Sequence, residues 1–332
     1  MKNRREFLKD AASSALILGS SAAASKLGFG AALRGNAASA GPKVVVARDP
    51  SIESAQLEEA GVLELLDRAM AAYTGRDRPI EAWKHIVPSG AVVGLKVNGL
   101  GGRGISTHAV LVKAVAERLQ QAGIAAANIV VWDRNARDLE ACGMTINTGS
   151  SGLRCFGSDL AGFEDEPVSC GAASVRLSKI LTRTCSFVIS LPILKDHSFA
   201  GVTFTMKNMY GVVDRPDALH GNNCNPGVAD LNAVPVIRGK VRFTIGDALS
   251  SVYQGGPGFH PEHLWRPSAL IVGEDRVAID TVAWRMLERK RAEAGLPTLE
   301  ADGRAPLYIA TAADSAHKLG IGDPTLIHRM EI

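Results

Sequence analysis

The chain has 332 residues, of which 46% are hydrophobic and 21% are charged, and its formal net charge is +3. A chain of this length and composition can bury a sizeable core, which excludes an intrinsically disordered protein. With 37 basic and 34 acidic residues, it lacks the basic excess of a nucleic-acid-binding protein.

The first 40 residues predict a targeting leader. Residues 3–9, with the sequence NRREFLK, match the twin-arginine export signal, except that Asn3 stands where Ser or Thr is usual. A weakly apolar run follows. Lys26 and Arg34 interrupt it, so it is too broken for a membrane-spanning helix of about 20 residues. The sequence AASA before Gly41 has the small residues of a cleavage site.

The leader predicts an exported, periplasmic protein that begins near Gly41 and has the twin-arginine translocase as its partner during export. Without the leader's six basic and two acidic residues the net charge becomes −1, so we expect neither nucleic acid as a partner nor a stable membrane span after cleavage. Because this route exports folded proteins, a cofactor inserted before export is an open possibility. The alternative interpretation is an amphipathic N-terminal helix or a retained membrane anchor.

From Lys43 onward, short β-branched segments alternate with helical periodicity, which predicts an α/β fold with a mainly parallel sheet covered by helices. We expect a single domain over residues 41–332, with an irregular loop region at about 142–174. The expected strands span residues 43–47, 91–98, 128–133, 187–191, 241–247 and 268–275. The expected helices span residues 53–73, 107–122, 178–183, 277–290 and 305–322, the second with Ser106 or Thr107 as its N-cap and Gly123 as its stop.

Five widely spaced cysteines contain no C-x-x-C pair, so neither a zinc ribbon nor an iron–sulfur cluster of the bacterial ferredoxin type is encoded. In an oxidising compartment up to two disulfides can form, with Cys142, Cys155 and Cys170 as the expected members. One thiol then remains unpaired. Cys185, beside an expected strand, is interpreted as a small buried residue.

The most polar segment, LPILKDHSFAGVTFTMKNMYG, follows the fourth expected strand. Lys195 can bind a carboxylate or phosphate, or act as a nucleophile or base, and His197 can transfer protons or bind a metal. Asp196 can orient an imidazole or bind a hard cation. Lys207 and Asn208 open a short expected helix whose amides favour an anion. These five residues form the candidate catalytic group, and the alternative is a set of solvated loop charges.

Other polar residues also stand where expected strands end. Asn98 closes the second strand, and a glycine-rich turn with Gly101 and Gly102 at its centre follows it. His108 begins the next helix, and Asp247 closes a later strand. Because ligands bind at the carboxyl ends of the strands in such sheets, these five residues are candidate cofactor contacts. The turn has neither the dinucleotide-binding nor the P-loop spacing, so it does not predict a nucleotide.

Metal ligation is a further possibility, although the sequence identifies no cofactor. Asp275 follows another expected strand and is placed at the same edge as the other strand-end residues. Two loops contain candidate metal ligands, and a solvated loop is the alternative for each. These groups are His260, Glu262 and His263, and the pair His220 and Cys224.

The polar segment resembles part of the domain-of-unknown-function family that is sometimes fused to bacterial ferredoxin modules. VGLKVNG and STHAVLVKAVAERLQQAG before it, and GDALSSVYQGGPG and ALIVGEDRVAIDTVAWRML after it, extend the resemblance over residues 43–287. This chain lacks the ferredoxin cysteines of the fused members, so an internal electron-transfer role is not expected. The resemblance implies that the family's most recognisable segment contains Lys195, His197, Lys207, Asn208 and Gly211.

These observations predict an exported enzyme that depends on a ligand or metal ion and acts on an anionic small molecule. Its cations would hold the anion, and His197 would transfer a proton or bind the metal. One alternative is a periplasmic accessory or binding protein that partners a redox enzyme and has no chemistry of its own. Another is a structural cluster in which Lys195 and Lys207 pair with Asp196 and Asp247 to hold loops together.

Overall fold

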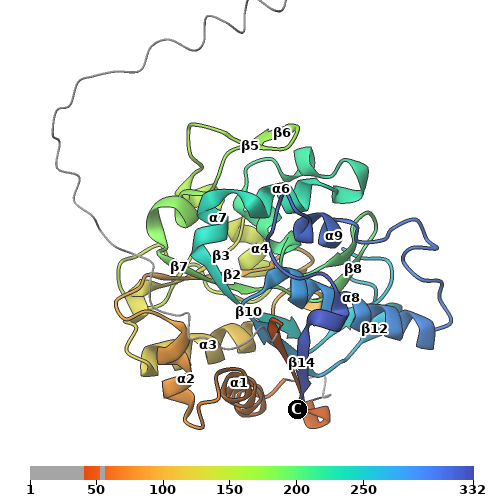
Figure 1. Ribbon diagram of the computed structural model, residues 1–332. Helices are drawn as coiled ribbons and strands as arrows, with labels where there is room; N and C mark the ends of the chain where they lie inside the picture. The colour runs from red at the N-terminus through yellow and green to blue at the C-terminus, as the bar shows by residue number, and fades with distance from the viewer. Residues whose placement is uncertain (1–40, 53–56) are drawn as a thin grey trace, which may run out of the picture. The chain divides into compact units, whose positions relative to one another are not determined.

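The structure, a computed structural model, describes residues 41–52 and 57–332 (Figure 1). The predicted leader at residues 1–40 lies outside the described residues, as does the predicted start of the first helix at residues 53–56. Among the described residues, no helix is both long enough and apolar enough to cross a membrane.

An eight-stranded sheet has the strand order β14-β1-β13-β10-β7-β2-β3-β4. Neighbouring strands are parallel except on either side of β13, which is antiparallel to both β1 and β10. The predicted α/β fold with a mainly parallel sheet is therefore confirmed. The strands are β1 (Lys43–Arg48), β2 (Val93–Val97), β3 (Ile129–Trp132), β4 (Arg154–Cys155), β7 (Phe187–Leu191), β10 (Val241–Ala248), β13 (Ala269–Gly273) and β14 (His328–Glu331).

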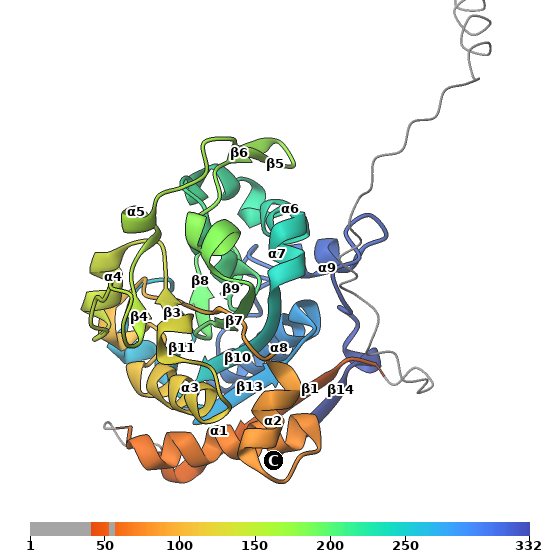
Figure 2. The same ribbon diagram turned by 90° about the vertical axis from the view of Figure 1, so that its left-hand side faces the viewer.

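Helices cover both faces of this sheet, as Figures 1 and 2 show. Burial on both faces explains why strands such as β2 and β7 are almost continuously hydrophobic in sequence. One face carries α1 (Glu59–Thr74), α2 (Pro79–Ile86) and α3 (Ala109–Gln121). The other carries α6 (Gly227–Ala233), α7 (Pro235–Lys240), α8 (Arg276–Glu293) and α9 (Tyr308–Ala313).

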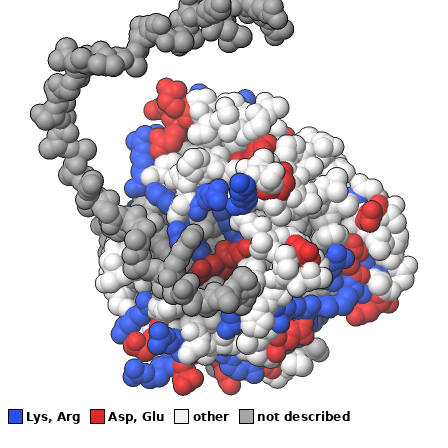
Figure 3. Space-filling model, in the orientation of Figure 1, with Lys and Arg blue, Asp and Glu red and all other residues white. Residues whose placement is uncertain are grey.

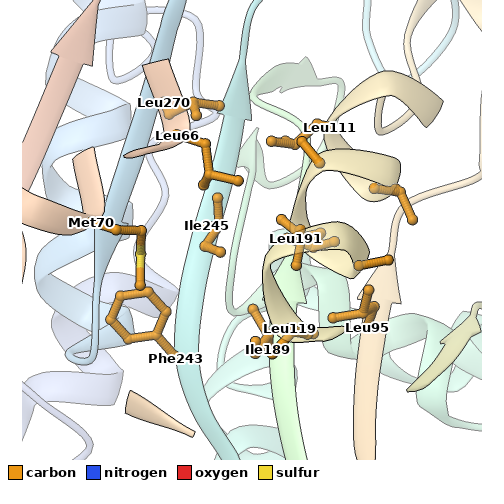
Figure 4. Packing of buried hydrophobic residues seen from close by; sticks show 14 of the residues in the cluster. Leu66, Met70, Leu95, Leu111, Leu119, Ile189, Leu191, Phe243, Ile245 and Leu270 are labelled. Carbon is orange, nitrogen blue, oxygen red and sulfur yellow. The ribbon is translucent and has the colours of Figure 1, made fainter. Parts of the chain in front are cut away.

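The strands divide their side chains between two cores because successive residues of a strand point to opposite faces. Val45 packs in the cluster beneath α1, whereas its neighbour Val44 packs in the cluster beneath α8. In Figure 4, Met70 of α1 lies beside Phe243 of β10, and Leu111 of α3 points toward the sheet. Fully burying one such side chain contributes about 1.5–3 kcal/mol.

Short elements complete the connections between the main strands and helices. The short strands and helices are α4 (Ala136–Ala141), α5 (Ser158–Ala161), β5 (Val168–Cys170), β6 (Ala173–Val175), β8 (Lys195–His197), β9 (Gly201–Thr203), β11 (Ser251–Val252) and β12 (Leu264–Trp265). Short 3-10 or π-helical segments lie at η1 (Pro50–Ile52), η2 (Gly102–Gly104), η3 (Ala126–Asn128), η4 (Ile180–Thr184), η5 (Lys207–Val212), η6 (Pro216–Leu219), η7 (Asn222–Cys224), η8 (Pro261–His263) and η9 (Pro324–Leu326).

The predicted N-cap of α3 is wrong. His108, rather than Ser106 or Thr107, is the N-cap residue, and its side chain makes no capping hydrogen bond. The Thr107 hydroxyl is occupied elsewhere: it accepts from the amide of Asn98 at 2.9 Å and donates to the carbonyl of Leu191 at 2.6 Å. These two bonds tie the start of α3 to the ends of β2 and β7.

The predicted helix at residues 305–322 is also wrong in length. It ends as α9 at Ala313, and the chain later returns as β14, which the sequence pattern did not predict. The carboxylate of Asp314 accepts from the amides of Ala316 and His317, each at 2.8 Å. This local turn satisfies the backbone without continuing the helix.

Smaller differences concern the connections. The region predicted as irregular contains β4, an edge strand of the sheet, and the helix predicted at residues 178–183 is the π-helical turn η4. The stop of α3 at Gly123 is as predicted, because its φ of +99° is a left-handed conformation that favours glycine. All five cysteines are buried, and within the described residues no disulfide joins any of them, so neither of the disulfides that the sequence permits is formed.

Candidate functional site

A cavity of about 310 Å³ lies where β2 and β3 end and where the polar segment follows β7. The carboxyl ends of parallel strands meet at this edge of the sheet, and ligands of α/β proteins bind there. The polar side chains around the cavity include Lys96, Asn98, Asp133, Lys195, His197, Lys207, Asn208, Tyr210 and His220.

Lys96 and Asp133 form a buried ion pair in the cavity wall. The Lys96 Nζ donates to Asp133 Oδ1 at 2.7 Å and to the carbonyl of Val97 at 2.6 Å. The other carboxylate oxygen accepts from the amide of Gly99 at 2.7 Å. Burial lowers the pKa of Lys96, and the charge of Asp133 opposes that shift. Gly211 permits this arrangement, because a Cβ there would lie 2.2 Å from Asp133 Oδ1.

Lys195 holds the glycine-rich turn against β8. Its Nζ donates to the side-chain oxygen of Asn98 at 3.3 Å and to two carbonyls of the turn, of which that of Leu100 is the closer at 2.6 Å. Burial lowers the pKa of Lys195 to about 7; the charge of Asp133 opposes this shift, and that of Lys207 adds to it. The ammonium is thus well hydrogen-bonded but loses its proton near neutral pH.

The short strand β8 separates Asp196 from its two neighbours, because alternate side chains of a strand point in opposite directions. Lys195 and His197 line the cavity, whereas Asp196 does not. Its Oδ1 accepts from Arg304 at 2.8 Å, and its Oδ2 accepts from the amide of Gly256 at 3.0 Å. Asp196 therefore joins two loops behind the cavity, and its ion-pair partner is an arginine rather than either of the predicted lysines.

His197 is held as a neutral ring of one tautomer. Its Nδ1 accepts from the amides of Phe199 at 3.1 Å and Ala200 at 3.2 Å, so its single proton is on Nε2. Burial first, and then the charge of Lys207, lower the pKa of His197 to about 2. The ring therefore offers an N–H donor to the cavity over the whole physiological pH range.

Lys207 contacts a second histidine that arrives from a different loop. Its Nζ lies 3.4 Å from His220 Nε2 and 3.9 Å from the centre of the Tyr210 ring. The His220 Nδ1 donates to the carbonyl of Pro216 at 2.9 Å, which leaves Nε2 as an acceptor for Lys207. Burial lowers the pKa of Lys207 to about 8, although the nearby Cys224 thiol opposes the shift.

Asn208 uses its amide to join the cavity wall to the sheet. Its Nδ2 donates to the carbonyl of Lys96 at 3.0 Å and to the hydroxyl of Ser190 at 3.1 Å, and its Oδ1 accepts from the Lys96 ammonium at 3.3 Å. Asn208 therefore positions the Lys96–Asp133 pair.

The cavity lining has four basic side chains and three acidic ones. Lys96 has Asp133 as its ion-pair partner, but within the described residues neither Lys195 nor Lys207 forms an ion pair with a carboxylate. On the molecular face drawn in Figure 3, by contrast, basic and acidic side chains are interspersed. What distinguishes the cavity is therefore its two lysines without a carboxylate ion-pair partner among the described residues.

The predicted cofactor contacts are divided between two places. Asn98 lines the cavity, and Gly101 lies next to it, because a Cβ there would be 3.6 Å from Lys195 Nζ. Gly102 has a φ of +70° and open space around it. The remaining pair, His108 and Asp247, lies outside the cavity lining and forms a hydrogen bond of 2.8 Å.

Asp275 is not at the predicted edge of the sheet. Because β13 is antiparallel to β10, its carboxyl end lies at the opposite edge from the cavity. The Asp275 carboxylate instead caps α8, where it accepts from the amides of Val277 and Ala278 at 2.9 Å each.

Three polar lining residues, Lys96, Asp133 and Tyr210, were missed as site residues in the sequence, and His220 was predicted only as a candidate metal ligand. Asp133 ends an expected strand. The expectation that polar residues at strand ends contact a ligand, which identified Asn98 and Asp247, therefore applies to Asp133 as well. Lys96 lies inside a hydrophobic strand, where a charged residue is itself a signal of a buried pair. His220 and Tyr210 had no such signal as a pair, because the folding of η6 brings them together.

The two predicted metal-ligand groups lie in different surroundings. The ligand atoms of His260, Glu262 and His263 all lie within 4.8 Å of one another, in the loop around η8. His220, from the second group, is hydrogen-bonded to Lys207 in the cavity.

Comparisons with known proteins identify a family. A family model described as a domain of unknown function, DUF362, matches residues 93–285, which include every cavity residue named above. A crystal structure of a Thermotoga maritima protein, a structural-genomics target, is similar, with a TM-score of 0.42 and 11% sequence identity. That match covers 72% of this chain and 60% of the other, so this chain spans about 60% of that protein's length. No curated protein matches.

Proposed function

The chain belongs to the DUF362 family of domains of unknown function, and we propose that it is an enzyme that binds a small organic anion in the cavity and transfers a proton on it. The family resemblance found in the sequence is confirmed over residues 93–285. The proposed activity is supported by the chemistry of the cavity.

The observation that carries the proposal is the pair of buried lysines without a carboxylate partner. Lys195 and Lys207 are 1% and 6% exposed, and a buried ionised group that lacks a counter-ion costs several kcal/mol. Their lowered pKa values, about 7 and about 8, are the consequence of this cost. An anion bound between them would supply the missing negative charge, so a carboxylate is the ligand group that the cavity favours.

The other groups can carry a proton transfer on such an anion. Lys207, when neutral, has a lone pair for the substrate while one of its N–H groups donates to His220. The neutral His197 ring offers its Nε2–H as a donor, which would stabilise negative charge developing on a carbonyl oxygen. Lys195, whose three N–H groups already donate to Asn98 and to the glycine-rich turn, would attract the carboxylate through its charge.

The test measures deuterium exchange into candidate substrates. Small 2-hydroxy, 2-oxo and 2-amino carboxylates that raise the melting temperature are incubated with the protein in D₂O, and loss of the C–H signal is followed by proton NMR. We expect exchange with the wild-type protein and a loss of at least about 100-fold in Lys207→Met. Lys113→Met, which changes an exposed lysine paired with Glu59, is the control. If the exchange rate were the same in Lys207→Met, the assignment of this base would be wrong.

The second candidate is a binding or accessory protein without chemistry, with a redox enzyme as its partner. Lys195 favours this candidate. Its Nζ has three oxygen acceptors, which the three N–H groups of an ammonium satisfy and a neutral amine does not. In the same experiment, anion binding without exchange would support this candidate. A protein that binds no anion at all would contradict both.

Export through the twin-arginine pathway is part of the proposal and is supported by the RREFLK segment. Replacing Arg4 and Arg5 with lysine should keep the protein in the cytoplasmic fraction, whereas the unchanged leader should deliver it to the periplasm. Equal distribution of the two forms between the fractions would argue against this route.

A further inference from the structure

A second group of catalytic residue types lies outside the lysine cavity. Ser250 follows β10 and leads into β11, and its Oγ lies 3.1 Å from His108 Nε2. The other nitrogen of that ring, Nδ1, lies 2.8 Å from Asp247 Oδ2. The three side chains therefore form one continuous chain of hydrogen bonds from carboxylate to imidazole to hydroxyl.

Asp247 fixes the tautomer and the orientation of His108. The carboxylate is fully buried, and it also accepts from the backbone amides of His108 at 2.8 Å and Leu249 at 3.1 Å. It has no proton to donate when ionised, so the Nδ1 of His108 must be the donor. The Nε2 is then an acceptor for the Ser250 hydroxyl, which is the arrangement in which a histidine can remove a serine proton.

A separate cavity of about 310 Å³ adjoins this group. His108 lines it together with Ser106, Thr107, Ala109, Cys142 and Gly143. Ser250 is partly exposed, and its hydroxyl is hydrogen-bonded to His108, which forms part of the cavity wall. Ser250 itself does not line this cavity, so a substrate bound there would meet the hydroxyl by extending past the His108 ring.

Donors for a negatively charged oxygen are also present in the wall of this cavity. The first internal hydrogen bond of α3 is donated by the amide of Leu111 to the carbonyl of His108. The amide of Ala109 lies before this bond, at the positive end of the helix dipole. Ser106 is 1% exposed, and its hydroxyl has no hydrogen-bond partner among the described residues. A buried hydroxyl without a partner is unusual, and a ligand oxygen would satisfy it.

We propose that Ser250, His108 and Asp247 form a nucleophilic triad that hydrolyses small acyl esters extending from this second cavity to the Ser250 hydroxyl. The order of the triad along the chain is His, Asp, Ser, and it uses loops at the ends of β2 and β10. The activity is independent of the anion chemistry proposed for the lysine cavity.

The reaction is a two-step acyl transfer. The Ser250 oxygen forms a bond to the ester carbonyl carbon while its proton moves to His108 Nε2, and the bond between carbon and the alcohol oxygen breaks as His108 returns the proton to the leaving alcohol. Water then attacks the carbonyl carbon of the acyl-serine while its proton moves to His108 Nε2; the bond between that carbon and the Ser250 oxygen breaks, His108 returns the proton to Ser250, and the acid is released. Ala109 N–H and Ser106 Oγ–H would hold the oxyanion in both steps.

The test uses a fluorophosphonate probe, which reacts with activated serines, on the full mature chain. We expect peptide mass spectrometry to place one adduct on Ser250 and the adduct to be absent in Ser250→Ala. Ser251→Ala is the matched control and should keep full labelling, because the Ser251 hydroxyl is buried and has no partner among the described residues. Lys207→Met should also keep full labelling, which separates this site from the lysine cavity.

The role of His108 is tested by rate. His108→Gln should slow labelling at least about 100-fold, the usual contribution of a general base. Although burial opposes it, the charge and hydrogen bond of Asp247 raise the pKa of His108, so the labelling rate of the wild-type protein should rise with pH through a value above 6.5. This profile also tests the proposal if His108→Gln does not fold. A folded wild-type protein without a Ser250 adduct, or with a pH-independent labelling rate, would overturn the triad.

Discussion

Lys207 and His220 meet in the cavity with their side-chain nitrogens 3.4 Å apart, and neither has a carboxylate among the hydrogen-bond partners that the structure gives it. The contact brings a lysine of lowered pKa against a histidine whose pKa is lowered as well, first by burial and then by the charge of Lys207. A buried lysine beside a buried histidine, both with lowered pKa values, is a site for a ligand of negative charge.

Replacing Lys207 with methionine should therefore weaken anion binding about 10- to 100-fold, because a charge-assisted hydrogen bond contributes about 1.5–3 kcal/mol. The folded protein should lose no stability, since the substitution removes a buried charge without a counter-ion and keeps most of the side-chain volume. Calorimetric titration with the tightest carboxylate and thermal melting measure the two effects. An unchanged dissociation constant, with Lys113→Met as control, would remove Lys207 from the binding site.

Anion affinity should fall as pH rises through about 7 and about 8. Below these values both lysines of the free protein are already protonated, and binding takes up no proton. Above these pKa values a lysine of the free protein is neutral and must take up a proton before the anion binds its ammonium form. Each such lysine weakens anion binding by about tenfold per pH unit. Titration in buffers of different ionisation enthalpy counts the protons taken up. A dissociation constant that is level from pH 6 to pH 9 would contradict the assignment.

Gly211 should be intolerant of any side chain. In Gly211→Ala the new Cβ would lie 2.2 Å from Asp133 Oδ1 and 2.6 Å from Lys96 Nζ, so the buried ion pair would have to move. We expect a loss of about 1–3 kcal/mol in the free energy of unfolding. Gly239→Ala, in α7 with open space around it, should instead stabilise the protein by up to about 1 kcal/mol. Urea unfolding of the two variants checks the contrast, and equal stabilities would contradict it.

The sequence predicted the sheet and the edge at which the cavity lies, because the hydrophobic strands and the polar residues that follow them are both local signals. It could not predict the direction of β13, since periodicity is the same for parallel and antiparallel strands, and Asp275 was therefore placed at the wrong edge. Nor could it separate Asp196 from Lys195 and His197, because the three-residue strand β8 exists only through its pairing with β9.

Contacts between distant loops were the least predictable part of the site. The pairing of Lys207 with His220 depends on η6, and the bonds from Lys195 to the glycine-rich turn join residues that are 90 and 95 positions apart. The sequence suggested that Lys195 and Lys207 were members of one cluster, and the cavity contains both. It could not indicate that Lys195 is saturated by oxygen acceptors whereas Lys207 is left open toward a ligand.

Asp196, a catalytic candidate in the sequence, should prove to be important for stability and not for chemistry. In the structure it is fully buried, and its carboxylate pairs with Arg304 and lies 4.0 Å from the buried Arg291. Asp196→Ala would leave these arginines without this partner, and breaking a buried ion pair costs on the order of 3 kcal/mol. Asp165→Ala, at an exposed position, should change stability little.

Urea unfolding of the Asp196 and Asp165 variants measures this cost, and deuterium exchange at a saturating anion concentration measures the chemistry. The part of the Asp196→Ala population that remains folded should exchange at a rate close to that of the wild-type protein, because the carboxylate faces away from the cavity lining. A variant of native stability that has lost exchange would restore Asp196 to the catalytic group. It would also show that β8 can turn its side chains toward the cavity when an anion binds.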